Sequence, residues 1–479
     1  MQKKSIKKNY LYNLSYQILA VITPLITAPY LARVLGADGI GEFSYASSIC
    51  AYFVYLALNG TSRFGQRQIS YVQNESYNRS VQFWEVKIFS FVTSFIVLLL
   101  YIPFALQQTN NVLLLILSLN IVNAAFDIAW FFQGMEEFKL IVLRNTIFKL
   151  IQITFIFLFV KEKSDLALYT FGHTGLILLS SLSLWGYLRR FIEKVRIKDL
   201  HPFKNTKVIF SLFLPTIAME IYSVLDKTMI GMITKESIEN GYYEQAMNIS
   251  RTALTIVTAL GTVMVPRIGN MFSQGNKAEV QNAMYRSYRF VWFIGIPMCL
   301  GLIGISSNFV PWFFGPGYDG VIPLLRILSV IIIAVGISNV TGVQYLIPTK
   351  KEGLFTKSVV IGAILNFLLN IPLIYFNGAI GAAIASVVAE VSIALVQILF
   401  VRNELSVKRI FSGSIRYLIS GIIMLGVLLL ERSLMKPSLI STILMIVSGG
   451  AVYMLEVFIF CDAFFLEYYS QIVKRFRRG

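Results

Sequence analysis

This sequence contains little charge, few cysteines and few histidines. Only 14% of its residues are charged, against roughly a quarter in soluble domains, whereas 56% are hydrophobic. A soluble globule with so little charge would expose large apolar patches and aggregate. The 3 cysteines stand far apart, which argues against a disulfide framework or a cysteine-based metal site, and 2 histidines are too few for a metal cluster. We therefore expect a membrane protein without a metal or another cofactor.

The sequence contains several long apolar runs with little or no charge. The segment from Phe89 to Asn110 carries no charge, and the segment 354–389 carries only Lys357. Each is long enough for the roughly 20 apolar residues that cross a bilayer as a helix. The apolar stretch from Tyr10 to Leu35 is too long for a signal peptide, so we expect it to remain as the first helix.

Hydropathy predicts an all-α, polytopic membrane protein with about fourteen transmembrane helices. If both termini are cytoplasmic, 31 of the 42 basic residues fall on the cytoplasmic side and only 5 on the opposite side. The net charge of +17 then reflects this bias and anionic lipid headgroups rather than nucleic acid. The predicted spans lie near residues 10–35, 41–60, 83–106, 112–133, 140–160, 166–188, 208–233, 242–265, 289–313, 321–347, 354–376, 380–401, 413–431 and 438–461.

A weak internal repeat relates two parts of the chain at an offset of about 200 residues. Gly41-Glu-Phe-Ser-Tyr-Ala46 resembles Gly241-Tyr-Tyr-Glu-Gln-Ala246, and each opens a predicted helix after a short external loop. Transporters often contain such repeats, although chance similarity between apolar helices is the alternative. We expect an N-terminal six-helix lobe at 1–188, a basic cytoplasmic linker at 189–207, a C-terminal six-helix lobe at 208–403, helices 13 and 14 at 404–461, and a basic cytoplasmic tail at 462–479.

Several motifs follow one another along nearly the whole chain. The most distinctive is Asp127-Ile-Ala-Trp-Phe-Phe-Gln-Gly-Met-Glu-Glu137. The others are Pro29–Ala46, Asn248–Arg251, Val265–Arg267, Phe313–Tyr318 and Gly342–Pro348. Together they resemble the motifs of polysaccharide-repeat-unit (Wzx-type) flippases, a family of the multidrug/oligosaccharidyl-lipid/polysaccharide exporter superfamily.

The resemblance implies both a fold and a function. The fold is two pseudo-symmetric six-helix lobes around a central cavity, followed by two C-terminal helices. The function is to move undecaprenyl-diphosphate-linked oligosaccharide from the inner to the outer leaflet of the bacterial cytoplasmic membrane. The product would serve capsule, exopolysaccharide or O-antigen synthesis.

Ionisable residues within the predicted spans are the candidates for the transport site, because such residues are costly in a bilayer and by default mark an interior or a substrate path. Similar depths predict two ion pairs, Asp226 with Arg251 and Asp127 with Lys149, for which a purely structural role is the alternative. Glu390 is the lone charge well inside its span, and we consider it for H⁺ or Na⁺ coupling. The candidate substrate-binding or cavity residues are Arg33, Asp127, Lys149, Glu220, Asp226, Lys227, Arg251, Arg326 and Glu390.

The expected mechanism is alternating access of the two lobes, not catalysis. A diphosphate with sugars cannot enter hydrocarbon unaided, whereas a cationic cavity would supply partners for its phosphates. The expected partners are the lipid-linked oligosaccharide, anionic membrane lipids and other glycan-assembly membrane proteins. One alternative is a cation-coupled multidrug exporter of the same superfamily, with Asp226 as the coupling carboxylate. A membrane glycan polymerase or ligase is another, which the short external loops disfavour.

Overall fold

The computed structural model describes residues 6–460, and every element in this range is a helix. The predicted basic tail at 462–479 and the third cysteine, Cys461, lie outside these residues. By length and apolar composition, 10 of the described helical segments are suited to cross a membrane. The prediction of an all-helical, multi-pass membrane protein is confirmed, whereas the count of fourteen helices stays a prediction.

The helices bury an apolar core, but they also expose many large apolar side chains and bury several polar ones, which is unusual for a soluble protein. On α3 (Ser76–Leu106), Phe95 and Leu100 are 61% and 64% exposed. On the same helix, the side chains of Ser80 and Lys87 are completely buried. Such an apolar outer surface would aggregate in water but matches the hydrocarbon of a bilayer.

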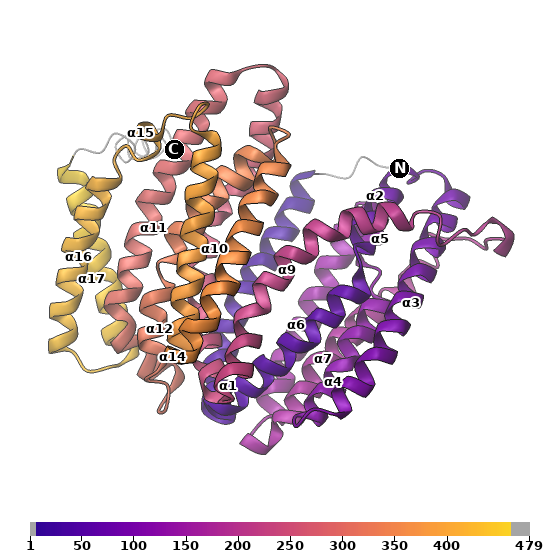
Figure 1. The fold of residues 1–479 in the computed structure, drawn as a ribbon, viewed down its shortest axis with the longest axis horizontal. Helices are drawn as coiled ribbons and strands as arrows, with labels where there is room; N and C mark the ends of the chain where they lie inside the picture. Colours follow the sequence, from indigo (N-terminus) through magenta and orange to yellow (C-terminus); the bar gives the residue numbers. More distant parts are fainter. Residues whose placement is uncertain (1–5, 461–479) are drawn as a thin grey trace. The chain divides into compact units, whose positions relative to one another are not determined.

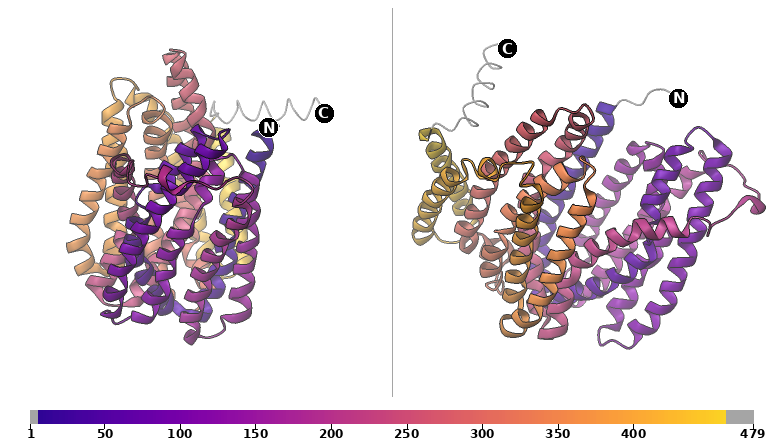
Figure 2. Two further views of the ribbon diagram at one scale, coloured as in Figure 1. Left: turned by 90° about the vertical axis from the view of Figure 1, so that its right-hand side faces the viewer. Right: turned by 45° about the horizontal axis from the view of Figure 1, so that its top comes forward.

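The chain forms two compact units, Met1–Gly241 and Tyr242–Gly479, whose long helices are shown in Figures 1 and 2. The boundaries predicted at 188 and 207 rest on the sequence repeat and stay a prediction. The first unit contains α1 (Ile6–Leu58), α2 (Thr61–Tyr71), α3, α4 (Asn111–Phe126), α5 (Ala129–Gly134), α6 (Phe138–Phe159), α7 (Leu166–Ser183), α8 (Trp185–Leu188) and α9 (Thr206–Thr234). The second contains most of α10 (Ser237–Ser273), then α11 (Lys277–Phe314), α12 (Val321–Leu328), α13 (Ile331–Ser338), the π-helix η3 (Asn339–Leu346), α14 (Glu352–Val401), α15 (Val407–Ile410), α16 (Ser414–Leu434) and α17 (Leu439–Ile459).

Glycines divide the two longest helices, α1 and α14. Gly36 and Gly378 have positive φ angles of 73° and 55°, a conformation that glycine adopts at little cost. A Cβ atom on Gly381 would lie 2.0 Å from the carbonyl oxygen of Leu373, whereas residues eight apart in a straight helix are separated by about 12 Å along its axis. The chain therefore folds back at Gly378, where the sequence predicts the boundary between two spans.

The first glycines of the two repeat motifs make reciprocal contacts. A Cβ atom on Gly41 would lie 1.7 Å from the carbonyl oxygen of Ser237, and one on Gly241 would lie 2.0 Å from that of Ala37. Ser237 is separated from Ala37 by the same 200 residues that separate Gly241 from Gly41. This pair of equivalent contacts supports the internal repeat.

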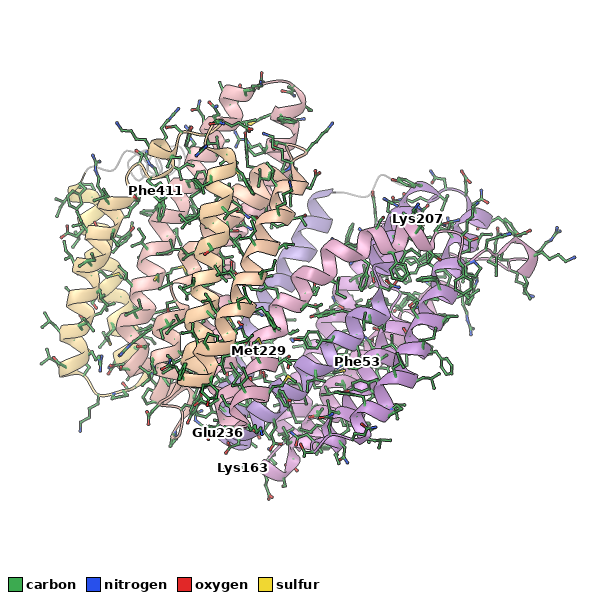
Figure 3. All side chains as sticks on the ribbon, in the orientation of Figure 1. Phe53, Lys163, Lys207, Met229, Glu236 and Phe411 are labelled. Atoms are coloured by element: carbon green, nitrogen blue, oxygen red, sulfur yellow. The ribbon has the colours of Figure 1, made fainter. Side chains whose placement is uncertain are left out.

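Loops that the topology assigns to opposite sides of the membrane lie at opposite ends of the first unit. Figure 3 shows Lys207, near the start of α9, at one end, with Lys163 and Glu236 at the other. The sequence assigns Lys207 to the cytoplasmic side and the loops around Lys163 and Glu236 to the external side. The structure therefore agrees with the prediction that these loops lie on opposite sides of the membrane. Which of the two ends faces the cytoplasm stays a prediction.

Candidate transport site

The distinctive motif that begins at Asp127 forms a break between α4 and α5. The Asp127 carboxylate accepts a hydrogen bond of 3.0 Å from the backbone N–H of Ala129, at the start of α5. The backbone carbonyl of Asp127 accepts one of 3.0 Å from the Lys87 ammonium, and that of Phe126 accepts one of 2.8 Å from the Trp185 indole. Backbone groups freed by a helix break within a membrane need such partners, so these side chains stabilise the break.

The second half of the motif packs against α2. A Cβ atom on Gly65 would lie 2.5 Å from the ring of Trp130, so only glycine lets α2 approach this closely. The carbonyl of Gly134 accepts a hydrogen bond of 2.6 Å from the side-chain amide of Gln73. The motif therefore joins α2, α3, α4 and α5 into one packed structure.

The predicted ion pair between Asp127 and Lys149 does not form among the described residues. The negative charge of Asp127 acts on Lys87, which is completely buried beside it. Lys149, half-buried on α6, is instead an electrostatic neighbour of His173 on α7, whose ring nitrogen contacts the Gln152 amide. Hydropathy placed the two groups at a similar depth, but they face different neighbours.

A polar layer joins α9 to α1 in the first unit. The Tyr52 hydroxyl donates a hydrogen bond of 3.0 Å to Thr228, and the Thr228 hydroxyl donates one of 2.9 Å to Ser48. Asp226, two residues from Thr228, is buried, and its charge acts on the Tyr52 phenol. The candidate carboxylate therefore lies close to a hydrogen-bonded polar layer within the helices.

The other candidates of the first unit differ in exposure. Arg33 is exposed on α1, whereas Glu220 and Lys227 are half-buried on α9. Asp226 belongs to the first unit and Arg251 to the second. The pair predicted between them stays a prediction.

The candidates of the second unit lie on three different helices. The Arg251 side chain is exposed on α10, and Glu390 is half-buried on α14. Arg326, on α12, donates hydrogen bonds of 2.9 Å and 2.6 Å to the hydroxyls of Ser306 and Ser307. These bonds hold the Arg326 guanidinium against α11, and its part in substrate binding stays a prediction.

A buried group of neutral polar side chains around η3 was missed by the sequence analysis. The Tyr288 hydroxyl is 2.8 Å from that of Thr341, and the Gln344 amide donates a hydrogen bond of 3.1 Å to Asn339. A π-helix at such a place is frequently associated with function. Intramembrane charges stand out in a sequence, whereas neutral polar residues resemble ordinary helix-packing groups. In residues 6–460 we find no group of three His, Cys, Asp or Glu side chains that would hold a metal ion.

Comparison with known sequences identifies the family. The family described as "Polysaccharide biosynthesis protein" matches residues 6–272, more than half of the chain. A relative from Escherichia coli (strain K12), named "Putative O-antigen transporter", is 26% identical over 412 residues, which cover 84% of this chain and 98% of the relative. A relative from Haloferax volcanii, named "Probable low-salt glycan biosynthesis flippase Agl15", is 25% identical over 256 residues, which cover 52% of this chain and 54% of the relative.

Comparison with solved structures identifies the fold. A structure entitled "Lipid II flippase MurJ, inward closed conformation" aligns with a TM-score of 0.72 and 17% identity, covering 94% of this chain and 98% of that one. An inward-facing multidrug resistance MATE family transporter of the MOP superfamily aligns with a TM-score of 0.58 and 13% identity, covering 85% of this chain and 98% of that one. The family predicted from the motifs is confirmed. This chain belongs to the polysaccharide biosynthesis protein family and has the fold of the multidrug/oligosaccharidyl-lipid/polysaccharide exporter superfamily.

Proposed function

We propose that this protein flips lipid-linked oligosaccharides across a membrane. The main observation in support is the alignment with the O-antigen transporter relative of Escherichia coli, which covers 84% of this chain and 98% of that relative. The fold, shared with a flippase over 94% of this chain, supports the same proposal. Transport of this kind moves the substrate between leaflets without making or breaking a covalent bond in it.

The proposal extends to the chemistry of the substrate. We assign it as an undecaprenyl-diphosphate-linked repeat unit that moves from the cytoplasmic to the outer leaflet of the bacterial cytoplasmic membrane, with both termini of the protein cytoplasmic. Arg251 lies fourteen residues into α10, or about 21 Å along its axis, and its side chain is exposed. An exposed arginine at this depth requires water or an anion, and a diphosphate supplies phosphate oxygens for its guanidinium.

Energy coupling and partners complete the proposal. Glu390 is half-buried within α14, and we assign it to H⁺ or Na⁺ coupling because a carboxylate at that depth is stabilised by taking up a cation. Alternating access would expose the substrate site to one side of the membrane at a time. Anionic lipids and other glycan-assembly proteins are the expected neighbours in the membrane.

Flipping in proteoliposomes tests the proposal. A lipid-linked oligosaccharide is reconstituted with wild type, Arg251→Ala or Arg416→Ala, and a membrane-impermeant lectin reports sugars that reach the opposite leaflet. Loss of a hydrogen bond to a charged group costs about 1.5–3 kcal/mol, so transfer by Arg251→Ala is expected to fall roughly 10- to 100-fold. The Arg416→Ala control removes an exposed arginine from the start of α16 and should transfer at the wild-type rate.

The possible outcomes distinguish the role of Arg251 from the flippase function itself. Transfer that persists in Arg251→Ala would refute the phosphate-binding role of that arginine and leave the flippase function intact. Folded wild type that transfers no glycan under either an H⁺ or a Na⁺ gradient would refute the flippase function. Efflux of a cationic dye by the same vesicles would then favour the multidrug exporter, whose fold this chain shares.

A further inference from the structure

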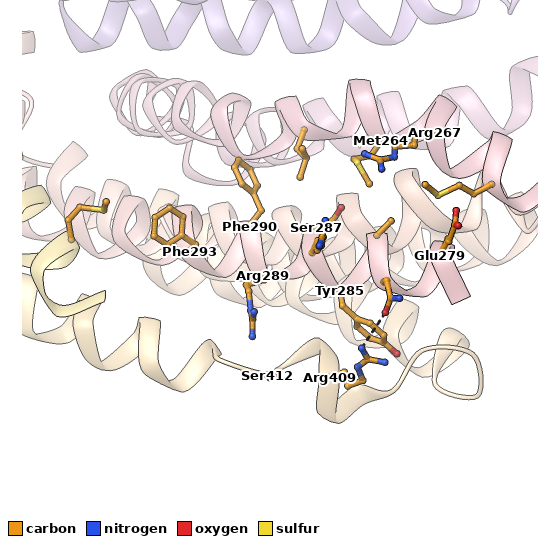
Figure 4. A pocket seen from close by; sticks show the side chains of 16 residues that line it. Met264, Arg267, Glu279, Tyr285, Ser287, Arg289, Phe290, Phe293, Arg409 and Ser412 are labelled. Atoms are coloured by element: carbon orange, nitrogen blue, oxygen red, sulfur yellow. Dashed lines mark hydrogen bonds between the residues drawn. The ribbon is translucent and has the colours of Figure 1, made fainter. Parts of the chain in front are cut away.

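The second unit contains a cavity of about 1030 Å³ that the transport proposal does not use. Its walls are residues of α10 and α11, the segment from α15 to the start of α16, and one residue of α17 (Figure 4). A volume of this size exceeds that of most small-molecule sites, so it accommodates a headgroup together with part of a hydrocarbon chain.

Positive charge dominates the polar part of this cavity. Four arginines line it, Arg267, Arg286, Arg289 and Arg409, whereas Glu279 supplies the one carboxylate among the described lining residues. Figure 4 shows Arg289 extending from α11 toward the segment that carries Arg409 and Ser412. Like charges gathered around one cavity repel one another, and an anion between them removes that repulsion.

The Arg409 guanidinium is held in place for such an anion. It stacks on the ring of Tyr285, with 4.2 Å between its central carbon and the ring centroid, and donates a 3.4 Å hydrogen bond to Asn282. The Tyr285 hydroxyl in turn accepts a 2.8 Å hydrogen bond from the backbone N–H of Ser406, just before α15. One face of the guanidinium is covered, and the bond to Asn282 occupies only part of its fork of donors.

The start of α16 favours an anion in the same place. Ser287 also lines the cavity, but its hydroxyl is buried, and residues two apart on a helix project about 200° apart, so it lies on the other side of α11 from Arg289. Arg289 lies beside the N-terminus of α16, where a Cβ atom on Gly413 would be 4.0 Å from the Arg289 Nε atom. Gly413 gives α16 no side-chain cap, so the positive end of the helix and the guanidinium face the same region.

Apart from Ser412, the rest of the lining is apolar. Leu260, Phe290, Phe293 and Met454 come from three different helices, and Met454 is 40% exposed on α17. The ring of Phe293 is 5.8 Å from that of Tyr417 and 6.1 Å from that of Tyr453, so this wall continues across α16 and α17. A ligand that matches both the cationic and the apolar part of the cavity carries a phosphate at one end and hydrocarbon at the other.

We propose that this cavity binds an anionic phospholipid. Its phosphate lies between Arg289 and Arg409, and an acyl chain lies along Phe293 and Met454. The basic residues at this end of α11 belong to the side of the membrane that we predict to be cytoplasmic, which is the headgroup level that such a lipid occupies. The bound lipid ties α10 and α11 to α16 and α17, and its binding is independent of the transported glycan.

Lipid retention measured by native mass spectrometry tests this proposal. Full-length protein in detergent is titrated with phosphatidylglycerol or phosphatidylcholine, and the dissociation constant of the first bound lipid is compared among variants. Near a membrane surface each basic residue contributes about 1 kcal/mol, so Arg289→Gln with Arg409→Gln should weaken phosphatidylglycerol binding roughly 30-fold. Ser287→Ala, which changes a buried group on the other side of α11 and leaves the arginines in place, should leave the dissociation constant unchanged.

A charge-matched control variant combines Lys194→Gln with Lys198→Gln. Both lysines are exposed in the basic segment of the first unit, so their loss should leave the dissociation constant unchanged. Equal retention of phosphatidylglycerol by wild type and the double arginine variant would overturn the proposal. So would equal retention of phosphatidylcholine and phosphatidylglycerol by wild type.

Two further ligands distinguish the source of the phosphate. If a polyprenyl diphosphate displaces phosphatidylglycerol at equimolar concentration while phosphatidylglycerol alone binds no better than phosphatidylcholine, the site belongs to the transported lipid and the proposal is wrong. If inorganic phosphate displaces bound phosphatidylglycerol as effectively as free phosphatidylglycerol does, the apolar wall contributes nothing to binding and the proposal is also wrong. Phosphatidylglycerol binding that resists inorganic phosphate is the expected result.

Discussion

Replacing Gly41 or Gly241 by alanine is expected to destabilise the protein. A methyl group would lie 1.7 Å or 2.0 Å from a backbone carbonyl oxygen, so the two segments must separate by roughly 1.5 Å before ordinary contact is restored. Overpacking of this kind costs about 1–3 kcal/mol, and the obstacle is backbone that no rotamer change removes. Because backbone cannot move aside, we expect a cost near the upper end of that range. Alanine recovers roughly 1 kcal/mol of helix propensity, which leaves a net loss of about 2 kcal/mol for each substitution.

Thermal unfolding in detergent, followed by tryptophan fluorescence, measures this loss. For a unit of this size about 1 kcal/mol corresponds to 2–4 °C, so each variant should melt about 4–8 °C below wild type. The control is Gly175→Ala on α7, where a Cβ atom would meet nothing within 4 Å, and its melting temperature should equal or exceed that of wild type. A Gly41→Ala protein that melts at the wild-type temperature would refute the argument from close approach. A large difference between the losses at Gly41 and Gly241 would refute their structural equivalence.

Three further substitutions test individual contacts. Lys87→Met keeps most of the side-chain volume but leaves the Asp127 carbonyl without its hydrogen-bond donor, so the melting temperature should fall by the equivalent of about 1–2 kcal/mol. An unchanged melting temperature would show that desolvation of the Lys87 ammonium offsets this hydrogen bond. Burial raises the pKa of Glu404, but hydrogen bonds and the charge of Lys351 outweigh it and hold that pKa below its ordinary value. The stabilisation by Glu404 is therefore present above the unfolded-state pKa and lost as pH falls through the folded-state pKa. In melting temperatures measured between neutral pH and about pH 3, Glu404→Gln should remove this acid-dependent loss. The same loss in wild type and variant would show that the contact contributes nothing. Arg326→Gln breaks two hydrogen bonds to serines and should cost about 1–3 kcal/mol in the same melting assay, with wild-type stability as the contradicting result.

The sequence predicted the class of fold and several helix boundaries from simple physical constraints. Apolar runs require helices in a bilayer, and the breaks at Gly36 and Gly378 fall where hydropathy ends one span and begins the next. The repeat around Gly41 and Gly241 was visible because both motifs open a helix. The contacts that these glycines make were not, since they depend on which faces of the helices meet.

The candidate site was harder to predict than the fold. Hydropathy gives the depth of a charged residue but not the direction of its side chain, which is why Asp127 was paired with Lys149 and not with Lys87. The arginine-lined cavity was missed for a related reason. Arg289 and Arg409 are 120 residues apart in sequence, and both were counted only as part of the positive charge on one side of the membrane.

The hydrogen bonds of the Asp127 motif also bear on what a sequence signature reports about substrate. Its carboxylate accepts a hydrogen bond from the first residue of α5, its tryptophan packs against a glycine of α2, and the carbonyl of its glycine accepts a hydrogen bond from the Gln73 amide, just after α2. A search pattern built on these residues therefore selects chains that break a helix in this way. Proteins that carry different glycans can share the pattern unchanged, so sugar specificity has to be sought in residues that the pattern leaves free to vary.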